Sequence, residues 1–269
     1  MYHTHCTMAR FSVAAAALAL CTTAGAAPLN VTVKVENLAP TNSISFAPLH
    51  FGFNNGSFDA FDNGAVATAP IISVAEGGSG SAWQPAFAAA DPTATRGTIG
   101  GLLQPGESRS SSFLVDPLLN PFFTFAAMVV PSNDFFIGND SPTRFRLFDA
   151  AGHLLIASIG QKARDLWDAG SELFDPAAAA FVGNNDLRTP QNGVVRFDFA
   201  ELAGFNGLTT GAGYVFNSAL TADSDVYRIS FAVVPEPETA VLIAVGLFAV
   251  AGVSRRRRGQ SSASALAPA

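Results

Sequence analysis

Cysteine is nearly absent from this sequence. The 269 residues contain two cysteines, Cys6 and Cys21, and both lie within the first 26 positions. Residues 27–269 therefore contain no thiol, which excludes a disulfide framework, thiol catalysis and a cysteine-ligated metal site from that part of the chain. Stability must come from a packed core, for which the 23 phenylalanines supply large apolar side chains.

Histidine and recognisable catalytic motifs are also scarce. Beyond residue 26 the sequence has two histidines, His50 and His153. His153 follows an expected turn, which predicts an exposed position, whereas His50 lies in an aromatic segment, which favours a hydrogen-bonded core or edge histidine over a ligand. The sequence contains no HExxH, GxSxG, phosphate-binding loop or dinucleotide fingerprint. Glycoside hydrolysis needs only two carboxylates, but no pair stands out by its spacing, so we expect a protein that is not an enzyme.

Charge is sparse, at 13% of residues, and its balance is acidic. Residues 27–233 contain 10 basic and 19 acidic side chains, a formal net charge of −9. This charge disfavours nucleic acid and anionic membrane surfaces as partners. An acidic surface is compatible with divalent cations.

The first 26 residues have the three parts of a secretory signal peptide. Arg10 precedes an apolar stretch at 11–20, and small residues follow at 24–26. We expect cleavage after Ala26 and export of the rest of the chain. A lipoprotein signal ending at Cys21 is the alternative, although Leu20 is bulkier than the residue that usually precedes a lipidated cysteine.

The C-terminal part places an apolar stretch between an acidic turn and an arginine cluster. The sequence VPEPE at 234–238 is followed by 16 uncharged residues and then by Arg255, Arg256, Arg257 and Arg258. A helix of this length extends roughly 24 Å, less than a hydrocarbon core of about 30 Å, so a permanent span is disfavoured. The arginines would orient the segment with its end on the cytoplasmic side. A buried core helix is also disfavoured, because residues 240–253 are apolar all round and no segment that looks foldable follows them to pack around such a helix.

This order of segments resembles the PEP-CTERM sorting signal of Gram-negative bacteria. The resemblance implies that Pro235, Glu236 and Pro237 are recognised by an exosortase-type membrane protease-transpeptidase. It also implies that the segment at 234–258 holds the chain in the inner membrane only transiently. The product would reach the cell surface, outer membrane or extracellular matrix, in association with exopolysaccharide and biofilm. Residues 259–269 form a polar tail beyond the arginines, where such signals usually end.

Residues 27–233 have the pattern of many short strands. Val31, Val33 and Val35 alternate with polar residues, which predicts a half-buried strand at 30–38. A similar alternation occurs at 226–234, and the apolar run at 122–130 predicts a central strand. Further strands are expected at 143–149, 153–159, 193–200 and 44–53, the last interrupted by Pro48, which favours an edge or a bulge.

Few segments favour helix. Residues 81–91 are expected to contain one or two helical turns, residues 54–64 a loop or short helix, and residues 149–152 a hairpin connection. Residues 74–110, rich in glycine, alanine and serine, have no clear pattern. Many short strands with few helices predict an all-β fold, an antiparallel β-sandwich.

Acidic residues gather in two expected loops. Asp134 directly follows the strand at 122–130, and residues 164–175 contain four acids around Gly170. These four are Asp165, Asp168, Glu172 and Asp175. Loop carboxylates at one end of a sandwich suit Ca²⁺, which takes about six to eight oxygen ligands. The spacing is not that of an EF-hand, and a solvated acidic loop is the alternative.

Four segments occur in the order and rough spacing of the spondin N-terminal domain, which residues 29–233 resemble. They are VTVKVENLAP (31–40), FGFNNGSFDAFDNG (51–64), MVVPSNDFFIGN (128–139) and LWDAGSE (166–172). The resemblance implies a C2-like β-sandwich that binds Ca²⁺ and serves adhesion, with Asp134, Asp168 and Glu172 as carboxylate ligands. Asp140 and Asp165 are weaker candidates. The chain departs from the animal domains by Phe135, where they usually have tryptophan, and by lacking their cysteines.

The sequence thus predicts four regions: a signal peptide (1–26), a spondin-like sandwich (27–233), a sorting signal (234–258) and a polar tail (259–269). The expected function is adhesion or binding at the cell surface or in the biofilm matrix. One alternative is a carbohydrate-active enzyme or lectin that acts on exopolysaccharide. Trp83 and Trp167 would then stack on sugars, although each is more simply a packing residue. Another alternative is a structural matrix component without a discrete ligand.

Overall fold

The computed structural model describes residues 27–181 and 184–234. The predicted signal peptide, the predicted sorting signal from Pro235 onward and the polar tail lie outside the described residues. Among the residues described, no helix combines the length and apolar character needed to cross a membrane.

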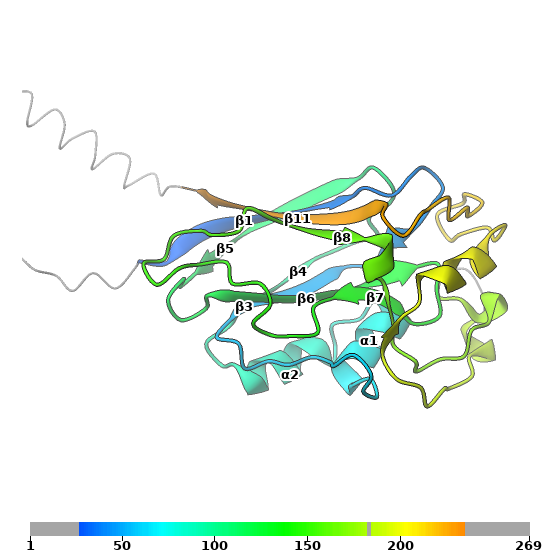
Figure 1. Cartoon of the computed structure of the whole chain (residues 1–269), viewed down its shortest axis with the longest axis horizontal. Helices are drawn as coiled ribbons and strands as arrows, with labels where there is room; N and C mark the ends of the chain where they lie inside the picture. The colour runs from blue at the N-terminus through cyan, green and yellow to red at the C-terminus, as the bar shows by residue number, and fades with distance from the viewer. Residues whose placement is uncertain (1–26, 182–183, 235–269) are drawn as a thin grey trace, which may run out of the picture.

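Two antiparallel sheets pack face to face, which confirms the predicted all-β sandwich (Figure 1). The first sheet has the strand order β5-β1-β11-β8, with β5 (Ser108–Val115), β1 (Leu29–Asn37), β11 (Asp225–Val234) and β8 (Ser158–Lys162). The second has the order β10-β9-β7-β6-β3-β4, with β2 paired to β6. Its strands are β10 (Arg196–Phe197), β9 (Trp167–Asp168), β7 (Phe135–Gly138), β6 (Phe122–Val130), β3 (Leu49–Asn54), β4 (Thr95–Ile99) and β2 (Ser45–Phe46).

The main core lies between the sheets and is rich in phenylalanine. Val31, Val33 and Val35 are buried there, because alternate side chains of β1 point to the inner face. Phe123 of β6 lies with its ring centroid 4.9 Å from that of Phe231 of β11, so aromatic contacts join the two sheets directly. Burial of these rings is the main source of stability in a domain without disulfides.

Two helices cover the outer face of the second sheet (Figure 1). Helix α2 (Trp83–Ala90) confirms the helical turns predicted at 81–91, whereas α1 (Ala69–Gly77) was not predicted. Trp83 and Phe87 of α2 are fully buried, and the ring of Phe87 lies 4.1 Å from that of Phe58. The second sheet is therefore buried on both faces, which explains why β6 is a continuous apolar run and not an alternating one.

The predicted strands at 30–38, 122–130 and 226–234 are confirmed by β1, β6 and β11. The strand predicted at 143–149 is wrong, because this segment forms only isolated bridges, such as the one from Arg146 to Phe122. At 153–159 the prediction is displaced, since β8 begins at Ser158, and at 193–200 it is too long, since β10 has two residues. The connection at 149–152 is a turn, in which the Asp149 N–H donates to the His153 carbonyl at 3.0 Å.

Pro48 separates β2 from β3 and does not mark an edge. Strand β3 is an inner strand between β6 and β4, so the first predicted alternative, an edge, is wrong. The second alternative, a bulge, is confirmed, because the four residue steps from Phe46 to His50 lie opposite three steps from Val129 to Ala126. The proline lies in the break between the two strands, where its missing N–H removes no ladder hydrogen bond.

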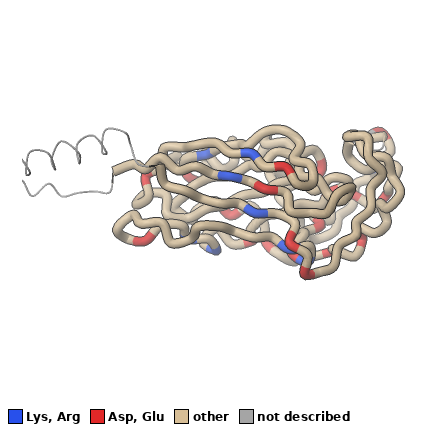
Figure 2. The backbone as a smooth tube through the Cα atoms, turned by 90° about the horizontal axis from the view of Figure 1, so that it is seen from above, with Lys and Arg blue, Asp and Glu red and all other residues tan. Residues whose placement is uncertain are grey.

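The described ends of the chain lie together, opposite a loop-rich end. Strands β1 and β11 are paired along their length, with Asn30 opposite Val234, so both ends leave the sandwich on the left of Figures 1 and 2. The opposite end is built mainly from residues 163–181 and 184–216, which we call the loop end. It contains the short helices η1 (Ala163–Asp165), η2 (Pro176–Ala178), η3 (Asn185–Leu187) and η4 (Phe199–Phe205).

Candidate functional site

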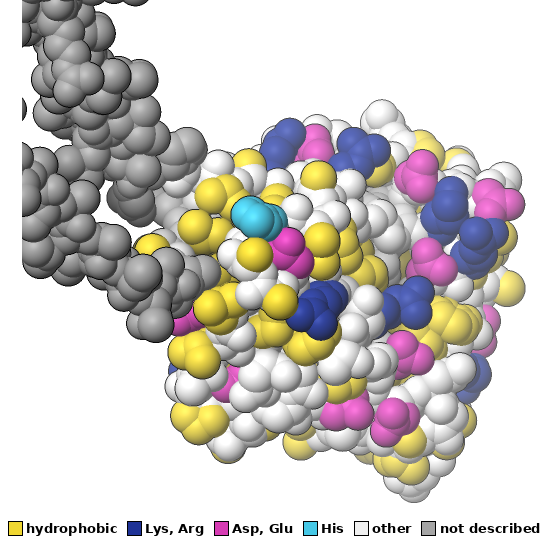
Figure 3. All heavy atoms as spheres, turned by 60° about the vertical axis from the view of Figure 1, so that its left-hand side comes forward, with side chains coloured by type: hydrophobic (Ala, Val, Ile, Leu, Met, Phe, Trp, Pro, Cys, Tyr) yellow, Lys and Arg dark blue, Asp and Glu magenta, His cyan; other side chains and the backbone are white. Residues whose placement is uncertain are grey.

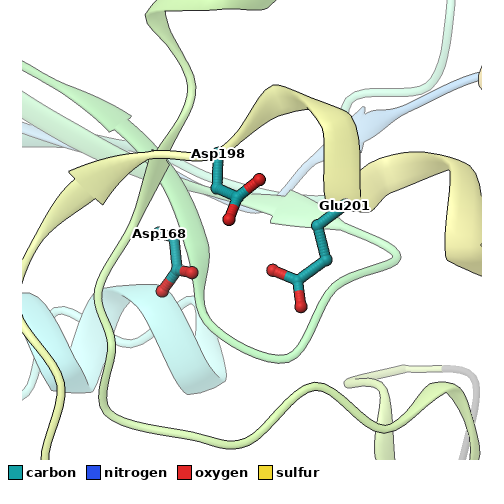
Figure 4. A group of neighbouring side chains, drawn as sticks. All are labelled: Asp168, Asp198 and Glu201. Carbon is teal, nitrogen blue, oxygen red and sulfur yellow. The ribbon is translucent and has the colours of Figure 1, made fainter.

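Three carboxylates meet at the loop end, and we call Asp168, Asp198 and Glu201 the carboxylate group. One oxygen of each lies within 4.8 Å of the others, and the side chains point toward a shared space (Figure 4). Asp168 ends β9, and the pairing of β9 with β10 places Arg196 opposite it. Asp198 follows β10, and Glu201 lies in the first turn of η4. Strand pairing thus assembles residues that are 30 positions apart in the sequence.

The carboxylate group has more negative charge than its neighbours neutralise. The Arg196 guanidinium lies 2.6 Å from Asp168 Oδ2 and 3.2 Å from Asp198 Oδ2. Burial, followed by the charges of Asp168 and Asp198, raises the pKa of Glu201 to about 7. Burial also raises the pKa of Asp168, although a hydrogen bond from the Gly170 N–H and the charge of Arg196 oppose this. One arginine against three acids leaves a place where an added cation would be stabilised.

Asp134 lies beside the carboxylate group and fixes the loop after β9. Its Oδ2 accepts hydrogen bonds from the Ser171 N–H at 2.7 Å and from the Glu172 N–H at 3.0 Å. The side chain is 2% exposed, and burial, followed by the charge of Asp168, raises its pKa to about 7. These bonds show that Asp134 holds the backbone of the loop in place.

Glu172 belongs to this loop and is buried. Its Oε1 accepts a hydrogen bond from Asn133 Nδ2 at 3.3 Å and lies 3.6 Å from Arg188 Nε. Its Oε2 is buried and has no hydrogen-bond partner among the described residues. Burial raises the pKa of this carboxyl.

The predicted ligands Asp134, Asp168 and Glu172 are all buried and lie in one region. Of these three, the carboxylate group contains only Asp168, since its other members are Asp198 and Glu201. Coordination of Ca²⁺ by Asp134, Asp168 and Glu172 therefore stays a prediction. The weaker candidates Asp140 and Asp165 line a separate pocket, and Asp175 caps η2 by accepting from the Ala177 N–H at 2.8 Å.

Sequence analysis missed Asp198 and Glu201. The two residues are three positions apart, which places them on one face of a helical turn, but they belong to no recognised motif. Asp168 is 30 positions before Asp198, so the sequence gives no indication that the three carboxylates lie together. The short β9–β10 pairing and the helix η4 bring them together.

The chemistry of the carboxylate group fits a hard divalent cation in part. Ca²⁺ accepts carboxylate oxygens in irregular geometry, and three carboxylates supply up to about six of them. Arg196 already contacts two of the three, so a bound cation would have to share or displace this guanidinium.

The two histidines of the described residues, His50 and His153, lie outside the loop end and are as predicted in their burial. His50 is buried, and its ring nitrogens lie 3.1 Å from Thr98 Oγ1 and 3.0 Å from the Gly78 carbonyl. Burial lowers its pKa, which favours a neutral structural histidine. The side chain of His153 is 79% exposed.

In comparisons with known proteins, no family model matches the sequence and no curated protein matches it. The resemblances to the spondin N-terminal domain and to the PEP-CTERM signal therefore stay predictions that depend on the segments quoted above.

Proposed function

We propose that this protein is an exported adhesion or binding protein of the cell surface or biofilm matrix, with Ca²⁺ ordering the loop end of its sandwich. The observation that supports this most is the carboxylate group, in which three acids at the loop end face one arginine. A cation bound there would fix β9, β10 and η4 relative to one another. Asp134 and Glu172 would support the same loop from the adjacent side.

The positions of the chain ends favour display of the loop end. Val234, the last described residue, lies beside Asn30 at the opposite end of the sandwich. The predicted sorting segment at 234–258 would therefore attach to the membrane on that side, and the loops would face outward. In this proposal an exosortase-type enzyme recognises Pro235, Glu236 and Pro237 and releases the protein to the surface or matrix.

The surface chemistry favours neutral or mixed partners. Figure 3 shows one face on which acidic and basic side chains are interspersed among hydrophobic and uncharged ones. A nucleic acid would need a broad basic patch, and the net charge of −9 in residues 27–233 opposes it. Extracellular polysaccharide or another matrix component is the partner class that we propose.

Thermal unfolding of a chain that begins at Ala27 tests the cation site. We expect a higher melting temperature with Ca²⁺ than with chelator, since a ligand at a hundredfold excess over its Kd stabilises by about 2.7 kcal/mol. The double variant Asp198→Asn, Glu201→Gln should lose this difference. The matched control Asp62→Asn, an exposed acid outside the group, should keep it. Identical melting curves with Ca²⁺ and chelator would contradict the cation proposal.

Cell fractionation tests the sorting proposal separately. Replacing Pro235, Glu236 and Pro237 by alanines should retain the chain in the inner-membrane fraction, because the recognition element is gone. The unaltered chain should appear at the surface or in the matrix. Equal distribution of both forms would show that this element does not direct sorting.

A further inference from the structure

We infer that a polar pocket on the flank of the sandwich binds a neutral saccharide unit. The pocket has a volume of about 360 Å³ and lies where β8, the edge strand of the first sheet, approaches the β9–β10 edge of the second. Six of its lining residues bear on the argument: Asp140, Arg144, Gln161, Asp165, Trp167 and Phe197. This inference rests on the proposed binding function and names the ligand class and its site, which lies outside the carboxylate group.

An aromatic platform forms one side of the pocket. The ring of Phe197 stacks on that of Trp167, with centroids 3.7 Å apart and planes 23° apart. Trp167 is 4% exposed and is fixed by its Nε1–H, which donates to the Gly138 carbonyl at 3.1 Å. Phe197 is 50% exposed, so the buried indole supports a phenyl ring that remains accessible to solvent. Such a ring suits the apolar C–H face of a pyranose.

The polar lining supplies both hydrogen-bond donors and acceptors. Asp140 offers carboxylate oxygens and Arg144 offers guanidinium N–H groups, and no ion pair joins these two within the described part of the chain. Sugar hydroxyls both donate and accept, so they match this mixed set. A purely apolar ligand would leave these charged groups desolvated and unpaired.

Two other lining side chains are held in place before any ligand binds. Asp165 Oδ2 accepts a hydrogen bond from the Lys162 N–H at 2.8 Å, and Gln161 Nε2 donates to the Gly160 carbonyl at 3.0 Å. Fixed side chains lose less conformational freedom on binding, which favours a specific site.

The charge of the pocket selects among saccharides. Two carboxylates, Asp140 and Asp165, face one guanidinium, that of Arg144, which leaves an excess of one negative charge. A uronic acid unit would be repelled by this excess, whereas a neutral hexose would not. Neither tryptophan predicted as a sugar platform is itself accessible, because Trp83 is fully buried and Trp167 is 4% exposed, so the exposed aromatic ring of the pocket is that of Phe197.

The test uses the exported protein and a panel of short neutral oligosaccharides (cello-, malto- and manno-series) beside matched uronic acid oligomers. Binding is measured by calorimetry and by tryptophan fluorescence, in which we assign a change to Trp167, since Trp83 does not line this pocket. We expect a neutral oligosaccharide to bind and Phe197→Ala to weaken it at least tenfold. Phe197→Tyr should retain binding, because the ring face is kept, and Asp140→Asn should weaken it severalfold.

Phe174→Ala serves as the control, because Phe174 is another phenylalanine of the loop end, 42% exposed and outside this pocket. The affinity of Phe174→Ala for the neutral oligosaccharide should equal that of the unaltered protein. Three results would each overturn the inference. They are an unchanged affinity of Phe197→Ala, a preference for uronic acid oligomers, and a failure to bind any neutral oligosaccharide.

Failure of this site and failure of the proposed function give different results. Calcium-dependent melting and surface location without saccharide binding would overturn the inference and leave the proposed function standing. Saccharide binding that Phe197→Ala abolishes, with no effect of Ca²⁺ on melting, would support the inference and contradict the cation. Release of reducing ends from the oligosaccharide would support the saccharide site and contradict a purely binding function.

Discussion

The sheet framework and the loop end of this protein are stabilised by different interactions. In the framework, the strands β1, β3, β6 and β11 bury valine and phenylalanine side chains between the sheets. In the loop end, short helices and two-residue strands are fixed by buried carboxylates, which accept hydrogen bonds from backbone N–H groups and contact arginines. Apolar burial does not depend on protons or ions, whereas the energy of a buried carboxylate depends on both.

This difference suggests a division of labour. The framework fixes the overall geometry, and the loop end contains the groups whose state changes with solution conditions. Asp134, Asp168 and Glu172 are each less than 5% exposed, so their charges are poorly screened by solvent. Conditions that alter these charges should change the stability of the loop end and leave the framework contacts intact.

The largest expected effect is in the framework. Phe123→Ala removes a fully buried ring whose centroid lies 4.9 Å from that of Phe231 and 5.2 Å from those of Phe51 and Phe53. We expect a loss of about 3–5 kcal/mol in the free energy of unfolding, since the cavity cannot close fully. Urea denaturation should give the same loss with Ca²⁺ and with chelator. A loss that depends on Ca²⁺ would break the proposed separation of the two regions.

The pH dependence of stability should arise in the loop end. The pKa of Asp134 is raised from 3.8 to about 7 in the folded protein, so the folded state binds more protons than the unfolded state between these values. The contribution of Asp134 to the free energy of unfolding is therefore most favourable below about pH 4, and it is lost as the pH rises to about 7.

Asp134→Asn should remove this loss, because an amide does not titrate. In chelator, the stability of the unaltered protein relative to that of Asp134→Asn should fall by about 3 kcal/mol between pH 4 and pH 7. Urea denaturation at several pH values measures this difference. Phe123→Ala should keep the pH dependence of the unaltered protein, and parallel pH curves for the unaltered protein and Asp134→Asn would contradict the assignment.

Arg196 provides a test within the carboxylate group. Its removal leaves Asp168 buried without its 2.6 Å partner, for which we expect a loss of about 2 kcal/mol in chelator. Ca²⁺ should restore part of this loss in Arg196→Ala, because the cation replaces the missing positive charge. Arg228→Ala, which removes a half-exposed framework arginine, is the control. Equal losses with and without Ca²⁺ would show that no cation binds near Asp168.

The same division explains how much could be predicted from the sequence. Strands β1, β6 and β11 were predictable, because alternation or continuous apolar character follows directly from which faces are buried. Strand β5 was not predicted. Its serine-rich residues are mostly exposed, and it is defined by its pairing with β1 along eight residues. A strand fixed by its partner leaves little trace in its own composition.

The candidate site was predictable to a similar degree. Asp134, Asp168 and Glu172 were predicted as site residues, and the structure places them together in the loop end. Asp198 and Glu201 join Asp168 only through a two-residue strand and a short helix, which depend on tertiary contacts. Sequence spacing gives no information on such long-range pairings.

The smallest expected effect lies on the surface of the framework. Lys34 Nζ contacts Glu36 Oε1 at 2.8 Å, but the lysine side chain is 46% exposed and the pair is screened by water. We expect Lys34→Ala to change the free energy of unfolding by less than about 0.5 kcal/mol, and less still at high salt. This salt dependence distinguishes it from the buried contacts of Asp134, which solvent ions reach poorly. If urea denaturation shows a loss at Lys34 as large as that at Arg196, then burial does not explain the difference between the two regions.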